Sequence, residues 1–138
     1  DYYDKYLRAV AEFDNYRKRT QKEKENLYLD GKADCVEAFL PLADNIERCI
    51  SALAETDDFE SLKKGVELIS KQFEDILKSL KVEPIPAVGE EFNPELHNAV
   101  MHIEDETCDT NVIVEEFQKG YRICDGKIIR HSMVKVAN

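Results

Sequence analysis

Several residue types and motifs are scarce in this chain of 138 residues, and their scarcity limits what the protein can be. The chain has no tryptophan, five glycines and four prolines. No apolar run is long enough to span a bilayer, and the first residues lack the basic start and apolar centre of a signal peptide. The chain starts directly in helix-like sequence, so we expect a further segment to precede it in the full-length protein.

The motifs of nucleotide binding and of covalent catalysis are also missing. The sequence contains neither G-x-x-x-x-G-K-[ST] nor G-x-G-x-x-G, so we expect no nucleotide to bind to this chain directly. His97 and His102 are five residues apart, which does not place them on one helical face, and His131 is isolated. A catalytic pairing of Cys108 or Cys124 with a histidine has little support, because neither lies in a recognisable nucleophile turn. We predict no catalytic residue, no cofactor and no enzymatic activity.

The four cysteines form no C-x-x-C pair and no pattern typical of a zinc site, so a metal site is not expected. They are Cys35, Cys49, Cys108 and Cys124. Cys35 and Cys49 are two heptads apart and can share one helical face, where cysteine behaves as a small apolar residue. This pattern favours reduced, partly buried thiols in a cytoplasmic protein over disulfides or catalysis.

The charge balance is strongly acidic. The chain has 29 Asp and Glu residues against 19 Lys and Arg, giving a formal net charge of -10 and a pI near 4.8. General binding to nucleic acid or to an anionic membrane needs a basic surface, so the composition argues against both. We therefore expect the partners to be proteins.

The residues that are present begin with a long helical segment, Asp1 to Leu40, which contains no proline and one glycine. At 1.5 Å per residue such a helix would be roughly 60 Å long. A compact chain of this length has a radius of gyration of only about 14 Å. The segment is therefore predicted to project from the rest of the chain as a stalk.

The stalk carries an apolar seam at its beginning. Tyr3, Tyr6, Val10 and Phe13 follow alternating three- and four-residue steps, which is a heptad a/d register. We expect a second copy to pair along it, although a charged, solvated helix remains the alternative. The same register then passes through residues mostly unsuited to a tight zipper: Arg17, Thr20, Lys24, Leu27, Gly31 and Asp34.

Residues 41–81 are predicted to form a helical hairpin. Pro41 should kink the first helix or start a new one. Asp57 is the expected N-cap of the second helix, with Glu60 completing a capping box and an end near Lys81. A lone hairpin leaves apolar surface uncovered, so two copies are expected to form a four-helix bundle. The residues predicted at the dimer interface are Tyr6, Val10, Phe13, Leu42, Ile46, Ile50, Leu62, Val66, Ile69 and Phe73.

Gly65 lies inside the second predicted helix, where glycine costs about 1 kcal/mol relative to alanine. Close helix packing would account for it, and so would a partner surface that approaches the backbone there. The sequence alone favours neither explanation.

A second domain is predicted over residues 82–138, since VEPIPAVGEEFNP contains three of the four prolines. Strand-like segments follow at 111–118, 121–130 and 132–137. Asp125-Gly126 is typical of a two-residue hairpin turn in which both residues have positive φ. We predict a small antiparallel β domain, which makes the fold class α+β.

Charge is segregated within this domain. No lysine or arginine occurs from Val82 to Gln118, whereas Asp125 is the only acid after residue 118. The basic residues that follow are Lys119, Arg122, Lys127, Arg130 and Lys135. Such polarity suits a docking surface, and ion pairing inside the domain is the alternative.

Five segments of the chain carry a family resemblance. AEFDNYRKRT, FLPLADNIERCI, KGVELISKQF, PIPAVGEEFNPELHNAV and EEFQKGYRICDGKIIRHSMVKVAN are similar to segments of GrpE, the nucleotide exchange factor of the DnaK-type chaperone. The resemblance covers essentially the whole chain. It implies a homodimer with a paired helical stalk, a four-helix bundle and one β domain per subunit.

The resemblance also implies a function and a set of contacts. GrpE proteins bind the chaperone's ATPase domain and hold its nucleotide cleft open, so that ADP leaves. By motif, the implied contacts are Phe92, Pro94, Phe117, Lys127 and Val136, with Arg17 and Lys18 from the stalk. Gly65 matches a family glycine, which favours partner approach.

Two further expectations concern the stalk and the competing function. GrpE stalks are associated with temperature sensing by reversible unwinding, and the poor seam after Phe13 predicts that the stalk melts before the bundle. The alternative function is a dimeric coiled-coil scaffold that presents two β domains for tethering other proteins.

Overall fold

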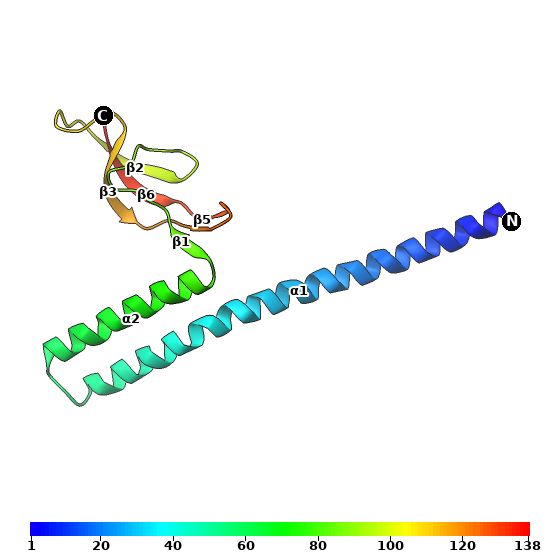
Figure 1. The fold of residues 1–138 in the computed structure, drawn as a ribbon, viewed down its shortest axis with the longest axis horizontal. Helices are drawn as coiled ribbons and strands as arrows, with labels where there is room; N and C mark the ends of the chain where they lie inside the picture. The colour runs from blue at the N-terminus through cyan, green and yellow to red at the C-terminus, as the bar shows by residue number, and fades with distance from the viewer. The chain divides into compact units, whose positions relative to one another are not determined.

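A computed structural model describes residues 1–138 and has two helices followed by six strands (Figure 1). The chain divides into two units, Asp1–Ile69 and Ser70–Asn138. The α+β class predicted from the sequence is confirmed. Neither helix contains a segment that is both long and apolar enough to cross a membrane.

The first helix, α1 (Tyr2–Leu53), is longer than the predicted stalk because it continues through Pro41. Of the two outcomes expected at Pro41, a kink or a new helix start, the new helix start is therefore wrong. A proline inside a helix costs about 3 kcal/mol because one backbone hydrogen bond is lost and the ring clashes with the preceding turn. α1 nevertheless remains continuous over 52 residues.

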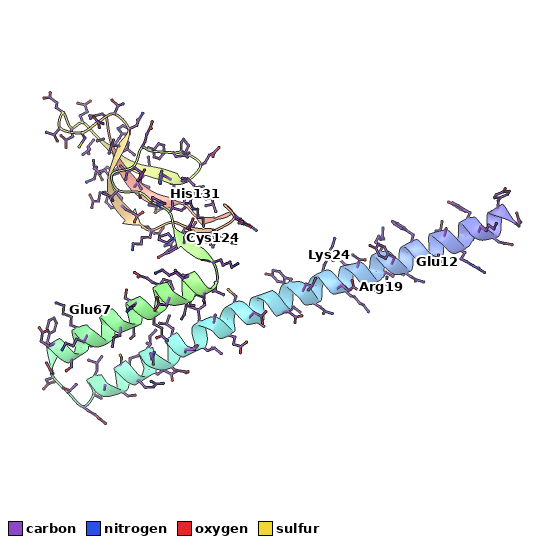
Figure 2. The ribbon with its side chains drawn as sticks, in the orientation of Figure 1. Glu12, Arg19, Lys24, Glu67, Cys124 and His131 are labelled. Atoms are coloured by element: carbon purple, nitrogen blue, oxygen red, sulfur yellow. The ribbon has the colours of Figure 1, made fainter.

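The apolar residues of the predicted seam of α1 are not buried by any other part of the chain. No residue of α1 is buried, and the side chains of Tyr6 and Phe13 are 62% and 64% exposed. Figure 2 shows side chains extending outward along the helix, among them Glu12, Arg19 and Lys24. The helix therefore offers its apolar side chains to solvent or to a partner.

The second helix, α2 (Phe59–Ser79), is capped by Asp58 and not by the predicted Asp57. The Asp58 carboxylate accepts hydrogen bonds from the Glu60 backbone N–H at 3.1 Å and from the Ser61 hydroxyl at 2.7 Å. These bonds hold the pKa of Asp58 below its ordinary value of 3.8, with the Ser61 hydroxyl as the main cause. The helix begins one residue later than the capping-box pattern predicts.

The end of α1 and the start of α2 form the predicted antiparallel hairpin (Figure 1). A Cβ added at Gly65 would lie 3.3 Å from the Cys49 sulfur, so the two helices approach closely at this glycine. This contact supports the close-packing explanation of Gly65. Ile46, Ile50 and Val66 remain exposed, so the hairpin does not cover its own apolar faces.

The end of α2 is joined to the β domain without a free linker. Lys81 adopts a left-handed conformation, with φ of 57°, and its backbone N–H donates to the Lys78 carbonyl. This is a helix C-terminal cap of the kind usually made by glycine. The Lys81 carbonyl then accepts a 2.8 Å hydrogen bond from Cys124 in the β domain.

The β domain contains two three-stranded sheets. One has the order β1 (Val82–Pro84), β4 (Tyr121–Ile123), β5 (Ile128–Arg130), and both its pairings are antiparallel. The other has the order β2 (His97–Ile103), β6 (Ser132–Ala137), β3 (Val112–Gln118). Strand β6 pairs antiparallel with β3 but parallel with β2, so the predicted all-antiparallel arrangement is wrong for this sheet.

The predicted hairpin between β4 and β5 exists, but its turn is of another kind. Gly126 has φ of 103°, whereas Asp125 is not among the residues with positive φ. The Gly126 N–H donates to the Ile123 carbonyl, and the Ile123 N–H donates to the Lys127 carbonyl. These bonds describe a three-residue loop that ends in a glycine bulge, not a two-residue turn.

The core of the β domain is small and lies mainly on one face of the mixed sheet. Its buried apolar residues are Ile85, Ala87, Ile113, Val134, Val136 and Ala137. Two polar residues, His97 and Ser132, are buried with them. Along β6, residues 132, 134 and 136 face this core and residues 133 and 135 face away, as the period of a strand requires.

All four cysteines are free. Cys49 and Cys108 are partly buried, as predicted. Cys35 and Cys124 are exposed, so the expected partial burial is wrong for them. Figure 2 labels Cys124 in the loop between β4 and β5.

The two sheets are joined where the β3–β4 connection meets the β5–β6 connection. The Gly120 N–H donates to the buried Ser132 hydroxyl at 3.0 Å. The Arg130 guanidinium donates to the Lys119 carbonyl through Nε at 3.0 Å and through Nη2 at 2.6 Å. A Cβ at Gly120 would lie 2.6 Å from the Ser132 Oγ and 2.7 Å from the Arg130 carbonyl oxygen. Only glycine fits at this crossing.

We predict that Gly120→Ala destabilises the β domain by roughly 2 to 4 kcal/mol, because the added methyl group overlaps backbone that cannot move aside. Urea unfolding followed by NMR signals of the β domain measures this change. Gly31→Ala is the control, since no atom lies within 4 Å of that position and alanine favours a helix by about 1 kcal/mol. A Gly120→Ala protein as stable as the wild type would contradict the crossing described above.

We predict that Asp58→Ala frays the first turn of α2 at neutral pH, whereas Asp57→Ala does not. The folded-state pKa of Asp58 is depressed, so its stabilisation is fully present above its ordinary value of 3.8 and is lost as pH falls through the folded value. The difference between wild type and Asp58→Ala should therefore shrink below pH 3.8. Cα chemical shifts of residues 59–62 measure the fraying, and equal effects of the two substitutions would contradict the assigned cap.

Candidate functional site

The outer face of the mixed sheet, the face turned away from the core, carries an exposed apolar surface. Residues paired across a sheet point to the same face, so Met101 and Glu115 lie beside Lys135, their common neighbour on β6. Met133 lies on the same face, two residues from Lys135. Phe117 is 48% exposed and its ring lies 5.7 Å from the Lys135 ammonium. We call these five residues the outer-face patch.

Lys135 contacts two other members of the outer-face patch. Its Nζ lies 2.7 Å from Glu115 Oε2 while it also lies over the Phe117 ring. Ion pairs near the surface, such as this partly exposed one, commonly contribute about 1 kcal/mol or less to stability. The pairing offsets the lysine charge, which leaves a surface dominated by one aromatic and two methionine side chains. Such surfaces are typical of protein contacts.

The predicted contact residues Phe92 and Pro94 lie elsewhere in the domain, in the loop between β1 and β2. Phe92 is partly buried and packs against the core cluster on the inner face of the sheet. Pro94 is exposed. Phe92 also lies near the start of β3, because its N–H donates to the Asn111 carbonyl, whereas Phe117 lies near the end of that strand. The two phenylalanines therefore do not share one face, and a partner touching both would reach across the β3 edge.

Val136, another predicted contact, is 1% exposed and belongs to the core. It lies on the central strand β6, whose backbone is paired on both sides. Its side chain therefore shapes the domain from within and is not presented to a partner in this arrangement.

Lys127 is exposed in the turn between β4 and β5 and has no ion-pair partner. Other basic residues of the domain are engaged internally. Arg122 pairs with Glu83 at 2.7 Å, directly across β4 and β1. Arg130 clamps the Lys119 carbonyl and lies 5.6 Å from the Tyr121 ring centre. The segregated charges predicted from the sequence are thus partly neutralised inside the domain.

On the stalk, Arg17 and Lys18 are both exposed on α1, but only Arg17 lacks an ion-pair partner. Lys18 lies 2.9 Å from Asp14 and lowers the pKa of that carboxyl through their hydrogen bond. Arg19 lies over the Tyr16 ring at 5.7 Å and within 3.8 Å of Glu23. Such exposed helical pairs are weak and leave these cations available.

No three His, Cys, Asp or Glu side chains are grouped so that they could hold a metal ion. A hollow of about 160 Å³ between the end of α2 and strands β1 and β4 is lined by Leu77, Val82 and Tyr121, among others. Small-molecule sites commonly measure about 300 to 1,000 Å³, so this hollow gives no support for a cofactor site.

Sequence reasoning named Lys135 among the basic residues of a docking surface but missed Met101 and Met133 as its neighbours. The alternation in SMVKVA contains the signal for Met133, since it falls between the buried positions of a strand. Met101 had no such signal, because its strand and the parallel pairing of that strand with β6 were not predicted.

Comparison with known proteins gives a consistent result along the whole chain. The GrpE family model matches residues 1–138. The chain belongs to the GrpE family. The match includes both helices and the β domain with its outer-face patch.

Individual relatives agree with the family match. Protein GrpE of Clostridium beijerinckii is 54% identical over 135 residues, covering 98% of this chain and 63% of that protein. Protein GrpE of Clostridium acetobutylicum is 52% identical over 135 residues, covering 98% of this chain and 65% of that protein. Protein GrpE of Bacillus pumilus is 44% identical over 133 residues, covering 96% of this chain and 71% of that protein. The chain thus spans less than two thirds of the two clostridial relatives.

Proposed function

We propose that this chain is the partner-binding part of a nucleotide exchange factor, a co-chaperone that binds the ATPase domain of a DnaK-type chaperone and accelerates ADP release. The observation that carries the proposal is the family match over residues 1–138, which covers the stalk and the β domain together. The factor acts in the cytoplasm, without turning over a substrate and without binding nucleotide, nucleic acid or membrane.

The mechanism is a shift of a conformational equilibrium. The ATPase domain alternates between closed and open forms of its nucleotide cleft, and ADP leaves from the open form. A factor that binds the open form more tightly raises the population of that form by the ratio of its two affinities. The β domain acts as the wedge, and its six-strand scaffold supplies rigid support for the contacts.

The contacts proposed on the β domain are the outer-face patch, centred on Phe117, together with Pro94 and Lys127. Phe92 contributes by supporting the loop that carries Pro94, since it packs on the core. Arg17 and Lys18 of the stalk add polar contacts, favoured by the exposure of both cations. Aromatic residues surrounded by less critical contacts commonly dominate the binding energy of such interfaces.

The active species is proposed to be a homodimer. The apolar residues predicted at the interface remain exposed or only partly covered within one chain. Tyr6, Val10 and Phe13 would pair in the stalk, while the hairpin residues would meet in a four-helix bundle. The uncovered faces of α1 and α2 support this assembly, because exposed apolar surface of that extent is unfavourable in water.

We predict that the protein accelerates release of a labelled ADP from the ATPase domain of a DnaK-type chaperone in a stopped-flow assay. Phe117→Ala should weaken binding at least about tenfold, because it removes the main exposed aromatic side chain of the patch. Phe59→Ala is the matched control, since that phenylalanine is also exposed but lies at the start of α2.

The same assay separates the exchange factor from the alternative, a dimeric coiled-coil scaffold that tethers two β domains to another protein. A scaffold would bind without changing the rate of ADP release. No acceleration at micromolar protein would reject the exchange-factor proposal. Equal losses from Phe59→Ala and Phe117→Ala would reject the assigned contact surface.

A temperature-dependent stalk is the second part of the proposal. The seam is apolar at Tyr6, Val10 and Phe13 but later passes through Arg17 and Lys24, so pairing there contributes little. We predict two transitions in far-UV circular dichroism on heating, the first from the stalk and the second from the bundle. One transition, coincident with loss of the dimer by light scattering, would be the contrary result.

A further inference from the structure

His97 is a buried polar residue that the proposed docking contacts do not use. It is 4% exposed and stands at the start of β2. Both ring nitrogens form hydrogen bonds with backbone groups. Nδ1 lies 3.0 Å from the Asn93 backbone nitrogen, and Nε2 lies 2.7 Å from the Pro86 carbonyl oxygen.

These partners determine which form of the imidazole fits. A backbone N–H can only donate, so Nδ1 accepts from Asn93 and carries no proton. A carbonyl oxygen can only accept, so Nε2 carries the proton and donates to Pro86. Only the neutral ring with its proton on Nε2 satisfies both bonds, because the charged ring has two donors and no acceptor.

The two backbone partners lie in the loop from Pro86 to Leu96, which carries Phe92 and the proposed contact Pro94. Pro86 begins this loop and Asn93 directly precedes Pro94, so the imidazole connects two points seven residues apart. The His97 N–H also donates to the Asn93 carbonyl at 2.8 Å. The ring of Phe92 lies 6.0 Å from the imidazole and is tilted by 35° to it.

Other bonds fix the middle of the loop against β3 but do not replace those of His97. The Gly89 N–H donates to the Ile113 carbonyl, and the Phe92 N–H donates to the Asn111 carbonyl. Neither bond reaches Pro86 or the turn at Asn93. Without the imidazole, the Asn93 N–H and the Pro86 carbonyl lose the partners that hold the start of the loop near the residue before Pro94.

We propose that His97 is a positioning residue for partner docking: its neutral imidazole sets the loop from Pro86 to Leu96 so that Phe92 supports Pro94 at the contact surface. This inference rests on the proposed function. His97 itself touches no partner, because it is buried, and it acts through the backbone that it holds. The inference adds a residue to the docking machinery that exposure alone would never select.

The test compares three variants in the full chain. His97→Phe keeps a ring of similar size but removes both hydrogen bonds. His97→Gln restores one acceptor and one donor. Arg122→Met is the control for general destabilisation, since it breaks the Glu83 pair in the other sheet and leaves the loop untouched. All proteins are assayed under solution conditions in which their urea-unfolding curves show them to be fully folded.

Two measurements are made on each protein. Affinity for the ATPase domain of a DnaK-type chaperone should fall at least tenfold in His97→Phe, recover to within about threefold of wild type in His97→Gln, and stay within about twofold in Arg122→Met. Without any partner present, ¹⁵N NMR of the wild-type ring should show the proton on Nε2. The backbone signals of Asn93 and Phe92 should shift in His97→Phe and return toward wild-type positions in His97→Gln.

The outcomes are distinguishable. Wild-type affinity in His97→Phe, or no recovery in His97→Gln, would overturn the positioning role. A proton on Nδ1 would overturn the hydrogen-bond assignment. If the wild-type protein does not speed ADP release, the proposed function fails and the docking role of His97 fails with it, while the loop signals still report whether His97 fixes the loop.

Discussion

The β domain depends on the crossing at which the β3–β4 connection passes the β5–β6 connection. Gly120 lies against Ser132 with no room for a side chain, and Arg130 fastens the neighbouring Lys119 carbonyl. The two sheets share no strand, so this crossing and the Ile85–Gly120 backbone bond keep them together. A core of so few buried apolar residues gains little stability from burial alone. Backbone contacts such as those at this crossing therefore help to fix the arrangement of the two sheets.

The helices, in contrast to the β domain, have few fixed contacts with the rest of the chain. Neither has a buried residue, so within one chain they gain little from tertiary packing, which usually stabilises helices in proteins. Their order comes from local interactions: caps at Asp1 and Asp58, and exposed pairs such as that of Asp14 with Lys18. A chain built this way has one part that is complete by itself and another whose stability is set by what covers it.

Features encoded by local periodicity could be predicted from the sequence, whereas those set by distant contacts could not. The apolar repeat of α2 and the alternation of β6 gave the elements correctly, because each pattern needs only its own residues. Strands β1 and β2 were missed, since β1 is three residues long and β2 pairs in parallel with a strand about 35 residues away. Val136 shows a different limit at the candidate site. The family resemblance implies a partner contact there, but the residue is 1% exposed and belongs to the core.

The left-handed cap at Lys81 has a mechanical consequence. Its carbonyl is bonded to Cys124, so the chain leaves α2 already attached to the β4–β5 hairpin, with no slack residues between helix and sheet. The residue that ends α2 is therefore also a hydrogen-bond partner of the β4–β5 hairpin. A change in the backbone conformation of residue 81 would break its bond to the hairpin, so the end of the helix and the β domain are coupled through this one residue.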